Sequence, residues 1–303
     1  MKKYFLVFLV CIIFIFSSCV VMKNVGDVMS GFGSIYDSPY MYMIGEVTSA
    51  IASASSPIST SQEYYIGRAV AANILNKYDV YENAIITEYV NKICQVLAIN
   101  SGCPELYKGY SVCLLNTNEI NAFATPGGHI LITRGFLECM KNEDALASII
   151  AHEMAHIQLK HGINSIKTDR WRNAFIKAGG ASVMFAFEDS FDGIDTENLE
   201  DFIACADIFS EGLNYGYAKE LEFEADKMAL SLLSFAGYNP NAIIEMLELI
   251  ETDSDYSLGG LFNTHPSPTD RIKNIQKNAV PSYTFEKGFE YRQQRFNLVM
   301  KDF

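Results

Sequence analysis

The sequence predicts an α+β fold that is mostly helical and carries one small antiparallel sheet. Apolar residues recur at helical spacing over most of the 303-residue chain. They alternate with polar residues only between Gly109 and Thr133, where a Pro126-Gly127-Gly128 turn separates short strands. We therefore expect one folded domain over residues 61–280, built around helices with the sheet beside them.

The N-terminus has the features of a secretory signal. Lys2 and Lys3 precede an apolar run that is shorter than the ~20 residues a membrane-spanning helix needs. The segment Phe16-Ser17-Ser18-Cys19 resembles a bacterial lipobox, in which the cysteine becomes the lipid-bearing first residue. We expect a lipoprotein signal peptide over residues 1–18, with an ordinary signal peptide as the alternative. The prediction places the protein in the bacterial cell envelope, on the periplasmic or extracytoplasmic face, anchored to a membrane through lipid on Cys19.

Helices follow a tether in the first half of the chain. Residues 19–60 are rich in Ser, Gly and Met, which predicts a lipid-anchored tether with a short helix. From Gln62 to Leu97 two apolar stripes at helical spacing predict two helices. Asn142 can cap a further helix that has Glu143 and Asp144 in its first turn and stops near Gly162.

The second half of the chain is predicted to be helical as well. Gly237 ends one of these helices, and Asn239-Pro240 starts the next with proline in its first turn. The remaining expected segments are a buried core helix over 178–187, an acidic solvated face or lid over 188–207, a helix over 217–235, and a C-terminal tail over 281–303.

Composition excludes several classes of protein. Hydrophobic residues make up 49% and charged residues 19%, which excludes a disordered or low-complexity chain. The 36 acidic and 23 basic side chains give a net charge of −13, which argues against nucleic-acid binding. The seven cysteines show no CxxC spacing, so we expect mostly buried thiols, although export permits a Cys94–Cys103 or Cys103–Cys113 bridge.

The segment His152-Glu153-Met154-Ala155-His156 carries the chemistry. On a helix, residues i and i+4 share a face, so both imidazoles can bind one metal ion. Glu153 lies beside that face and can take a proton from a water on the metal. The pattern therefore predicts a zinc site inside the capped helix.

A catalytic zinc needs a third protein ligand. His161 lies five residues after His156, which turns it about 140° off the ligand face of a straight helix. The segment Glu222-Phe223-Glu224-Ala225-Asp226 offers carboxylates instead. Glu222 and Asp226 share a helix face, so Glu222 can bind the metal while Asp226 accepts the outer N–H of a ligand histidine. Spacing alone leaves Glu220, Glu222 and Glu224 nearly equal as the third ligand.

Four blocks in unchanged order over residues ~60–280 resemble the gluzincin family of HtpX- and BepA-like zinc peptidases (metallopeptidase family forty-eight), in particular its soluble lipoprotein branch. Together they are more specific than any single motif. The blocks are Gln62–Arg68 with Tyr78 and Tyr89-Val90, Asn121–Ile130 with Thr133-Arg134-Gly135, Asn142–His161, and Lys219 to Asp226 followed by Thr264-His265-Pro266 and Arg271-Ile272.

This resemblance implies a zincin-type metallopeptidase domain whose edge strand lies beside the HExxH helix. It implies one zinc ion per chain held by His152, His156 and Glu222. It also gives Glu153 the role of general base and acid and makes Asp226 the residue that orients a ligand histidine.

The resemblance further implies residues that contact substrate. Asn121, Ala122 and Phe123 would bind an extended substrate backbone by strand addition. His265 would either donate to the oxyanion of the transition state or occupy the open zinc position and keep the enzyme latent, and a structural role for a loop histidine before Pro266 is the alternative. Arg271 is expected to pair with a carboxylate rather than to touch substrate.

The sequence thus predicts a zinc-dependent endopeptidase that hydrolyses unfolded or misassembled envelope proteins, in protein quality control. The partners expected are these protein substrates and a membrane, with no nucleic acid. One alternative is a non-enzymatic chaperone or assembly factor that binds exposed strands and carries a structural or latched zinc. Another is a metal-dependent amidase or aminopeptidase that acts on small substrates.

Overall fold

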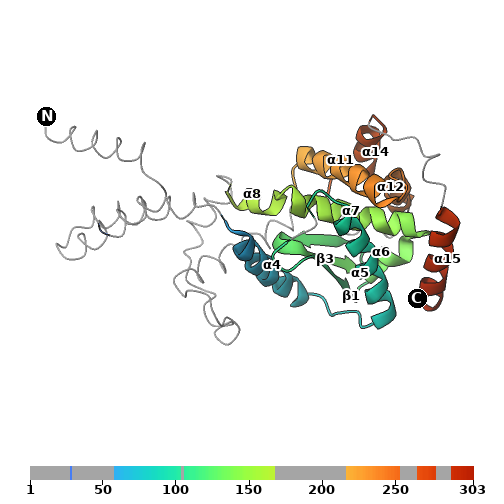
Figure 1. Cartoon of the computed structure of the whole chain (residues 1–303), viewed down its shortest axis with the longest axis horizontal. Coiled ribbons are helices and arrows are strands. Elements are labelled where there is room, and N and C mark those ends of the chain that lie inside the picture. Colours follow the sequence, from blue (N-terminus) through green and yellow to red (C-terminus); the bar gives the residue numbers. More distant parts are fainter. Residues whose placement is uncertain (1–27, 29–57, 104–105, 168–215, 253–264, 278–287) are drawn as a thin grey trace. The chain divides into compact units, whose positions relative to one another are not determined.

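Helix α7 (Glu143–Gln158) is the central element of the fold. The computed structural model describes residues 28, 58–103, 106–167, 216–252, 265–277 and 288–303. Every residue of α7 from Glu143 to Ile157 is buried. Helices α11 (Lys219–Ala236) and α12 (Ala242–Thr252) pack on one side of α7, and the sheet packs on the other (Figure 1). The other described elements are α4 (Thr60–Leu75), α5 (Ala84–Ile99), β1 (Ser111–Leu115), β2 (Ala122–Thr125), η1 (Pro126–Gly128), β3 (His129–Thr133), α6 (Arg134–Cys139), α8 (His161–Lys167), α14 (Pro268–Gln276), α15 (Phe289–Val299) and η5 (Met300–Asp302).

The sheet has three strands in the order β1-β3-β2. Strands β2 and β3 form an antiparallel hairpin around η1, with Phe123 opposite Leu131. Strand β1 runs parallel to β3, with Cys113 opposite Leu131. The predicted antiparallel sheet is therefore wrong in one pairing, and the sheet is mixed. The alternation in the sequence reports which side chains are buried, but it does not report which strands are neighbours.

The helix starts follow the capping signals. The Asn142 side chain accepts a hydrogen bond from the backbone N–H of Ala145 at 2.7 Å, so the predicted cap of α7 is confirmed. Ser59 and Asn83 cap α4 and α5 in the same way. Gly237 ends α11 with φ 80°, as predicted. Helix α12 begins at Ala242, after a turn that contains the predicted Asn239-Pro240 start.

The chain breaks after α7 at a residue with left-handed backbone. Lys160 has φ 56°, which a residue with a Cβ rarely adopts. Helix α7 therefore ends at Gln158, and α8 begins anew at His161. The helix predicted to run toward Gly162 is two helices with a sharp turn between them, and this turn changes where His161 lies.

Four cysteines lie in the described residues, and all four are free thiols. Cys94 is buried, Cys103 is exposed, and Cys113 and Cys139 are half-buried. The Cys94–Cys103 and Cys103–Cys113 bridges that export would permit are therefore absent.

The C-terminal end of the chain packs against the central helix. Helix α15, within the segment expected to be a tail, contacts both α7 and α5 (Figure 1). None of the helices in the described ranges combines the length and apolar character needed to cross a bilayer. The signal segment with Cys19, most of the 19–60 tether, the 178–187 helix and the acidic 188–207 segment lie outside the described residues.

Candidate metal centre

The two histidines of α7 point their Nε2 atoms at one position. His152 and His156 lie one helical turn apart, and their Nε2 atoms are 3.2 Å from each other. Both side chains are buried. Two ring nitrogens this close repel each other if both carry lone pairs, so the geometry requires a proton or a cation between them.

Two further donors come from other elements. Glu222 projects from the first turns of α11 and is fully buried, with its carboxylate oxygens 3.4 Å from His152 Nε2 and 3.5 Å from His156 Nε2. His265, just before α14, places Nδ1 2.7 Å from Glu222 Oε2. One ligand atom from each of the four residues lies within 4.8 Å of all the others. Three histidines and one glutamate therefore form a zinc-type site.

The electrostatics of this cluster fit a divalent cation. Burial would raise the pKa of Glu222, but its interactions with the neighbouring imidazoles, including hydrogen bonds with His152 and His265, hold it well below its usual range. Burial lowers the pKa of His156 well below its usual value, so its ring is neutral. A metal needs both of these protonation states. Glu222 Oε1 is buried and has no hydrogen-bond partner among the described residues, which leaves an acceptor for the ion.

His152 is bound on its outer edge by a carboxylate and an arginine. Its Nδ1 lies 3.0 Å from Asp226 Oδ1, one turn after Glu222 on α11. Arg271 on α14 is buried and donates to both Asp226 oxygens, at 2.6 and 3.0 Å. Burial and Arg271 would lower the pKa of His152, but the hydrogen bonds to Asp226 and Glu222 raise it to about 9. Arg271 thus pairs with a carboxylate, as the sequence predicts.

Glu153 is buried beside the cluster without belonging to its four donors. It follows His152 on α7, and burial raises the pKa of its carboxyl group. The nearby charges of His152 and His265 partly offset this effect. A carboxyl group with a raised pKa next to a metal position is suited to accept and return a proton.

Comparison with known proteins assigns the family. The family model described as "Peptidase family M48" matches residues 84–279, which contain all four donors and Glu153. The chain belongs to peptidase family M48. The described residues hold the zinc-type site of this family, and His152, His156 and Glu222 are its ligand set.

Individual relatives of this M48 chain are distant. It is 25% identical over 253 residues to the putative beta-barrel assembly-enhancing protease of Vibrio cholerae, covering 82% of the chain and 51% of that protein. It is 26% identical over 231 residues to the beta-barrel assembly-enhancing protease of Escherichia coli K12 (75% and 46%). It is 28% identical over 194 residues to the mitochondrial metalloendopeptidase OMA1 of Schizosaccharomyces pombe (63% and 52%). The chain therefore spans about half the length of these relatives.

Strand β2 lies beside the metal helix of the M48 site. It has one sheet neighbour among the described residues, β3, and it packs against α7. Asn121, Ala122 and Phe123 are all buried, so their side chains offer little surface to a ligand. The Asn121 backbone is tied to Thr133, whose hydroxyl and N–H both donate to its carbonyl. What β2 can offer a peptide is main-chain hydrogen bonding along its outer edge.

The turn after β2 is fixed by helix α4. Gly127 has φ 75°, and a Cβ there would lie 2.3 Å from Tyr64 Cα on α4. A Cβ on Gly67 of α4 would lie 1.7 Å from the carbonyl oxygen of Pro126. The two backbones are therefore in direct contact, and the Pro-Gly-Gly sequence permits this approach as well as making a tight turn.

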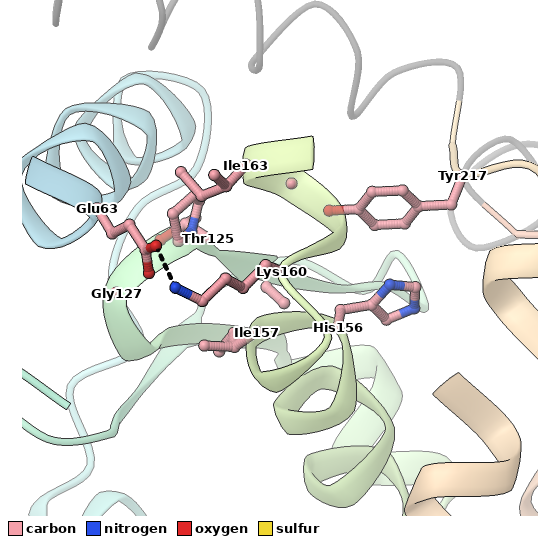
Figure 2. A pocket seen from close by; sticks show the side chains of 11 residues that line it. Glu63, Thr125, Gly127, His156, Ile157, Lys160, Ile163 and Tyr217 are labelled. Atoms are coloured by element: carbon pink, nitrogen blue, oxygen red, sulfur yellow. Dashed lines mark hydrogen bonds and ion pairs between the residues drawn. The ribbon is translucent and has the colours of Figure 1, made fainter. Parts of the chain in front are cut away.

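A small pocket lies between this turn and His156. Its empty space is about 240 Å³, including its open mouth. Figure 2 shows Tyr217, Lys160 and Glu63 around it, with Lys160 Nζ donating to Glu63 Oε1 at 2.7 Å. The Tyr217 ring is stacked on His156, with centroids 4.4 Å apart and planes at 16°. Nothing in the sequence marked Tyr217, Lys160 or Glu63 as neighbours of the metal site, because their approach is a tertiary effect.

The structure separates the carboxylates that spacing left equal. Glu222 is fully buried in the cluster, whereas Glu220 and Glu224 are exposed. His161 is not one of the four donors, but it lies against His156 rather than turned away from it. His161 therefore stays outside the donor set, as predicted, although it does not lie where a straight helix would place it, because α7 ends before it.

Proposed function

We propose that this chain is a zinc-dependent endopeptidase that hydrolyses peptide bonds in unfolded or misassembled proteins of the cell envelope. The observation that carries the proposal is the convergence of His152, His156 and Glu222 from two helices, beside the buried carboxyl group of Glu153. Membership of family M48 supports the reaction type. The names of the two bacterial relatives, which refer to β-barrel assembly, support envelope proteins as the substrate class.

Each side chain has a role that follows from its position. A zinc ion at this site supplies a Lewis acid for the peptide carbonyl and makes water a nucleophile at neutral pH. Glu153 accepts the proton of the attacking water on its carboxylate and returns it to the leaving nitrogen. Asp226 accepts the Nδ1–H of His152 and holds that ring in the orientation that aims Nε2 inward. The outer edge of β2, from Asn121 to Phe123, binds an extended peptide through main-chain groups, with little side-chain selectivity.

Zinc content and casein cleavage by the purified full-length chain test the proposal. We expect one zinc ion per chain, and variants of single glutamates provide the controls. Glu153→Gln should keep zinc and lower the cleavage rate about 10²- to 10⁴-fold. Glu222→Gln should lose zinc, whereas the exposed Glu220→Gln should keep both zinc and activity. Unchanged cleavage by Glu153→Gln would contradict the mechanism.

The four-donor arrangement also favours a second candidate function. His265 completes a set of four protein donors, and structural zinc sites are closed in this way, whereas catalytic sites keep one position open. The chain would then be a chaperone or assembly factor that binds exposed strands along β2, with a structural or latched zinc. In that case Glu153→Gln would leave the cellular phenotype intact.

His265→Ala separates the two roles of this residue. If His265 occupies the open position and keeps the enzyme latent, its removal raises casein cleavage while zinc is retained. If it donates to the oxyanion, its removal lowers the cleavage rate, because several kcal/mol of transition-state stabilisation are lost. Mass spectrometry of the casein fragments distinguishes an endopeptidase from an aminopeptidase, because only the former produces internal cuts.

We further propose that residues 1–18 are a lipoprotein signal peptide and that residues 19–60 tether a peptidase domain over 61–280 to a membrane through lipid on Cys19. The lipobox-like segment Phe16-Ser17-Ser18-Cys19 supports this proposal. Metabolic labelling with a radioactive fatty acid tests it. We expect label on the wild-type chain and none on Cys19→Ala, with the exposed Cys103→Ala as a control that keeps the label.

A further inference from the structure

His161 is a buried histidine that the zinc site and the proposed mechanism leave without a role. It begins α8 directly after the left-handed Lys160, and it is 3% exposed. Its Nδ1 lies 3.0 Å from Nδ1 of His156, on the side of that ring facing away from the four donors. The break between α7 and α8 is what brings the two rings together.

The positions of the protons follow from the geometry of His156. Its Nε2 faces the donor cluster, 3.2 Å from His152 Nε2 and 3.5 Å from Glu222 Oε1. A metal ion at this site would take the Nε2 lone pair, and a histidine ring bound through Nε2 carries its proton on Nδ1. This N–H can donate only to an acceptor, so Nδ1 of His161 bears a lone pair and the His161 proton sits on Nε2.

The outer edge of His161 is consistent with this tautomer. Its Nε2 has no hydrogen-bond partner among the described residues. It faces Glu224 Oε2 at 3.6 Å, which is longer than a hydrogen bond, and the Glu224 side chain is 63% exposed. An N–H there points toward a carboxylate, whereas a lone pair would be repelled by it.

The two zinc-binding histidines of α7 are therefore held in different ways. His152 has the Asp226 carboxylate and Arg271 at its outer edge. His156 has a neutral imidazole at its outer edge and the Tyr217 ring stacked on one face. The stacked Tyr217 ring covers a face of His156 and offers no partner in the ring plane to Nδ1, whereas His161 does.

We propose that His161 is a positioning residue for the metal site: its Nδ1 accepts the Nδ1–H of His156, which fixes the tautomer and rotation that aim His156 Nε2 at the zinc ion. The proposal depends on the zinc site of the proposed function and not on proteolysis, so measurements of metal binding test it independently of protease activity. A partner of this kind typically changes metal affinity about 10- to 100-fold when it is removed.

Two substitutions at residue 161 separate positioning from packing. His161→Leu fills a similar volume without an acceptor, whereas the Oδ1 of His161→Asn lies near the position of Nδ1 and can accept the same bond. We expect the Leu variant to bind zinc about 10- to 100-fold more weakly in competition with a chelator, and the Asn variant to recover most of that loss. Glu224→Gln is the matched control for the outer edge, and its zinc affinity should change less than that of the Leu variant.

Cobalt replaces zinc to report ligand geometry directly. The visible absorption of the Co²⁺-loaded Leu variant should differ from that of the wild type, and that of the Asn variant should not. The proposal is overturned if the Leu variant binds zinc as tightly as the wild type, or if the Leu and Asn variants lose affinity equally.

Nitrogen NMR of the zinc-loaded wild-type chain keeps the test independent of whether the variants fold. We expect the His156 ring to be protonated at Nδ1 and the His161 ring at Nε2. A His161 ring protonated at Nδ1 cannot accept the bond, and this result would overturn the proposal whatever the variants show.

Discussion

Replacing Arg292 with alanine should destabilise the protein more than replacing Arg295, although both arginines of α15 pair with acids in the first turn of α7. Arg292 binds both oxygens of Asp144, at 2.6 and 3.0 Å, and the two side chains are 12% and 3% exposed. Arg295 binds Glu143, but its own side chain is 52% exposed. Burial of the arginine is therefore the main difference between the two pairs.

The expected magnitudes follow from what each acid retains. Breaking a fully buried pair costs about 3–5 kcal/mol because an uncompensated charge is left behind. Asp144 keeps the favourable helix N-terminus, so we expect a loss of about 2–3 kcal/mol for Arg292→Ala. Glu143 keeps two hydrogen bonds, from the hydroxyls of Tyr89 at 2.7 Å and Tyr238 at 3.2 Å. Because Arg295 is half-exposed, we expect its loss to cost about 1 kcal/mol.

The pH dependence of the Arg292→Ala variant gives a second measure. Burial raises the pKa of Asp144 above its ordinary value even with Arg292 in place, and removal of the guanidinium raises it further. A raised pKa means that the folded state binds the proton more tightly than the unfolded chain does. The stability of the variant should therefore fall as the pH rises through that pKa. The difference in stability between the variant and the wild type should shrink as the pH is lowered toward the pKa of Asp144 in the unfolded chain.

Urea denaturation followed by circular dichroism measures these losses, since urea does not screen charge. The control is Lys92→Ala on α5, which breaks an ion pair with Glu88 whose side chains are 66% and 67% exposed. We expect the control to lose less than about 0.5 kcal/mol. Equal losses for Arg292→Ala and Lys92→Ala would refute the argument that burial determines the cost.

Gly67→Ala should lower the free energy of unfolding by about 2 kcal/mol or more, because its methyl group would overlap a backbone carbonyl of η1; urea denaturation tests this against Gly102→Ala, whose methyl group meets open space. A thiol reagent at pH 8 should label the exposed Cys103 rapidly and leave Cys94 unmodified in the folded chain, because burial raises the pKa of Cys94 to about 12; mass spectrometry of labelled peptides measures both. Burial and the hydrogen bond to the Glu119 carboxylate raise the pKa of Tyr78 to about 12. The stability that neutral Tyr78 contributes should therefore be present below pH 10 and lost between about pH 10 and 12. Tyr78→Phe should reduce this alkaline loss in urea titrations.

Local elements of the fold could be predicted because their signals lie within a few residues. Asn142 marks the start of α7, Gly237 marks the end of α11, and the 109–133 alternation marks the strands. Strand direction could not be predicted in the same way, because β1 pairs with β3 and not with β2, which follows it in the sequence. The end of α7 was missed because nothing in the sequence at Leu159-Lys160 marks a left-handed residue there.

Helical spacing predicted the two histidine ligands of the zinc site but not its third ligand. The i, i+4 rule placed His152 and His156 on one face, and the structure brings them together. Choosing Glu222 over its neighbours needed the family resemblance, because three acids on one helix start differ only in what packs against them. Glu143 and Asp144 show the same limit: a helix-dipole argument explains acids in a first turn, but not their burial against arginines about 150 positions away in the sequence.

The central helix is restrained at sites that are far enough apart to act independently. Asp144 and His152 are eight residues apart, or about 12 Å along α7, and substitutions at such distances usually have additive effects on stability. Zinc would link α7 to α11 at the second site, whereas α15 holds the first turn through Asp144, which is not one of the four donors. The stability gained from zinc binding should therefore be the same in the wild type and in Arg292→Ala, even though their absolute stabilities differ. A smaller gain in the variant would mean that α15 sets the position of the ligands as well as holding the helix.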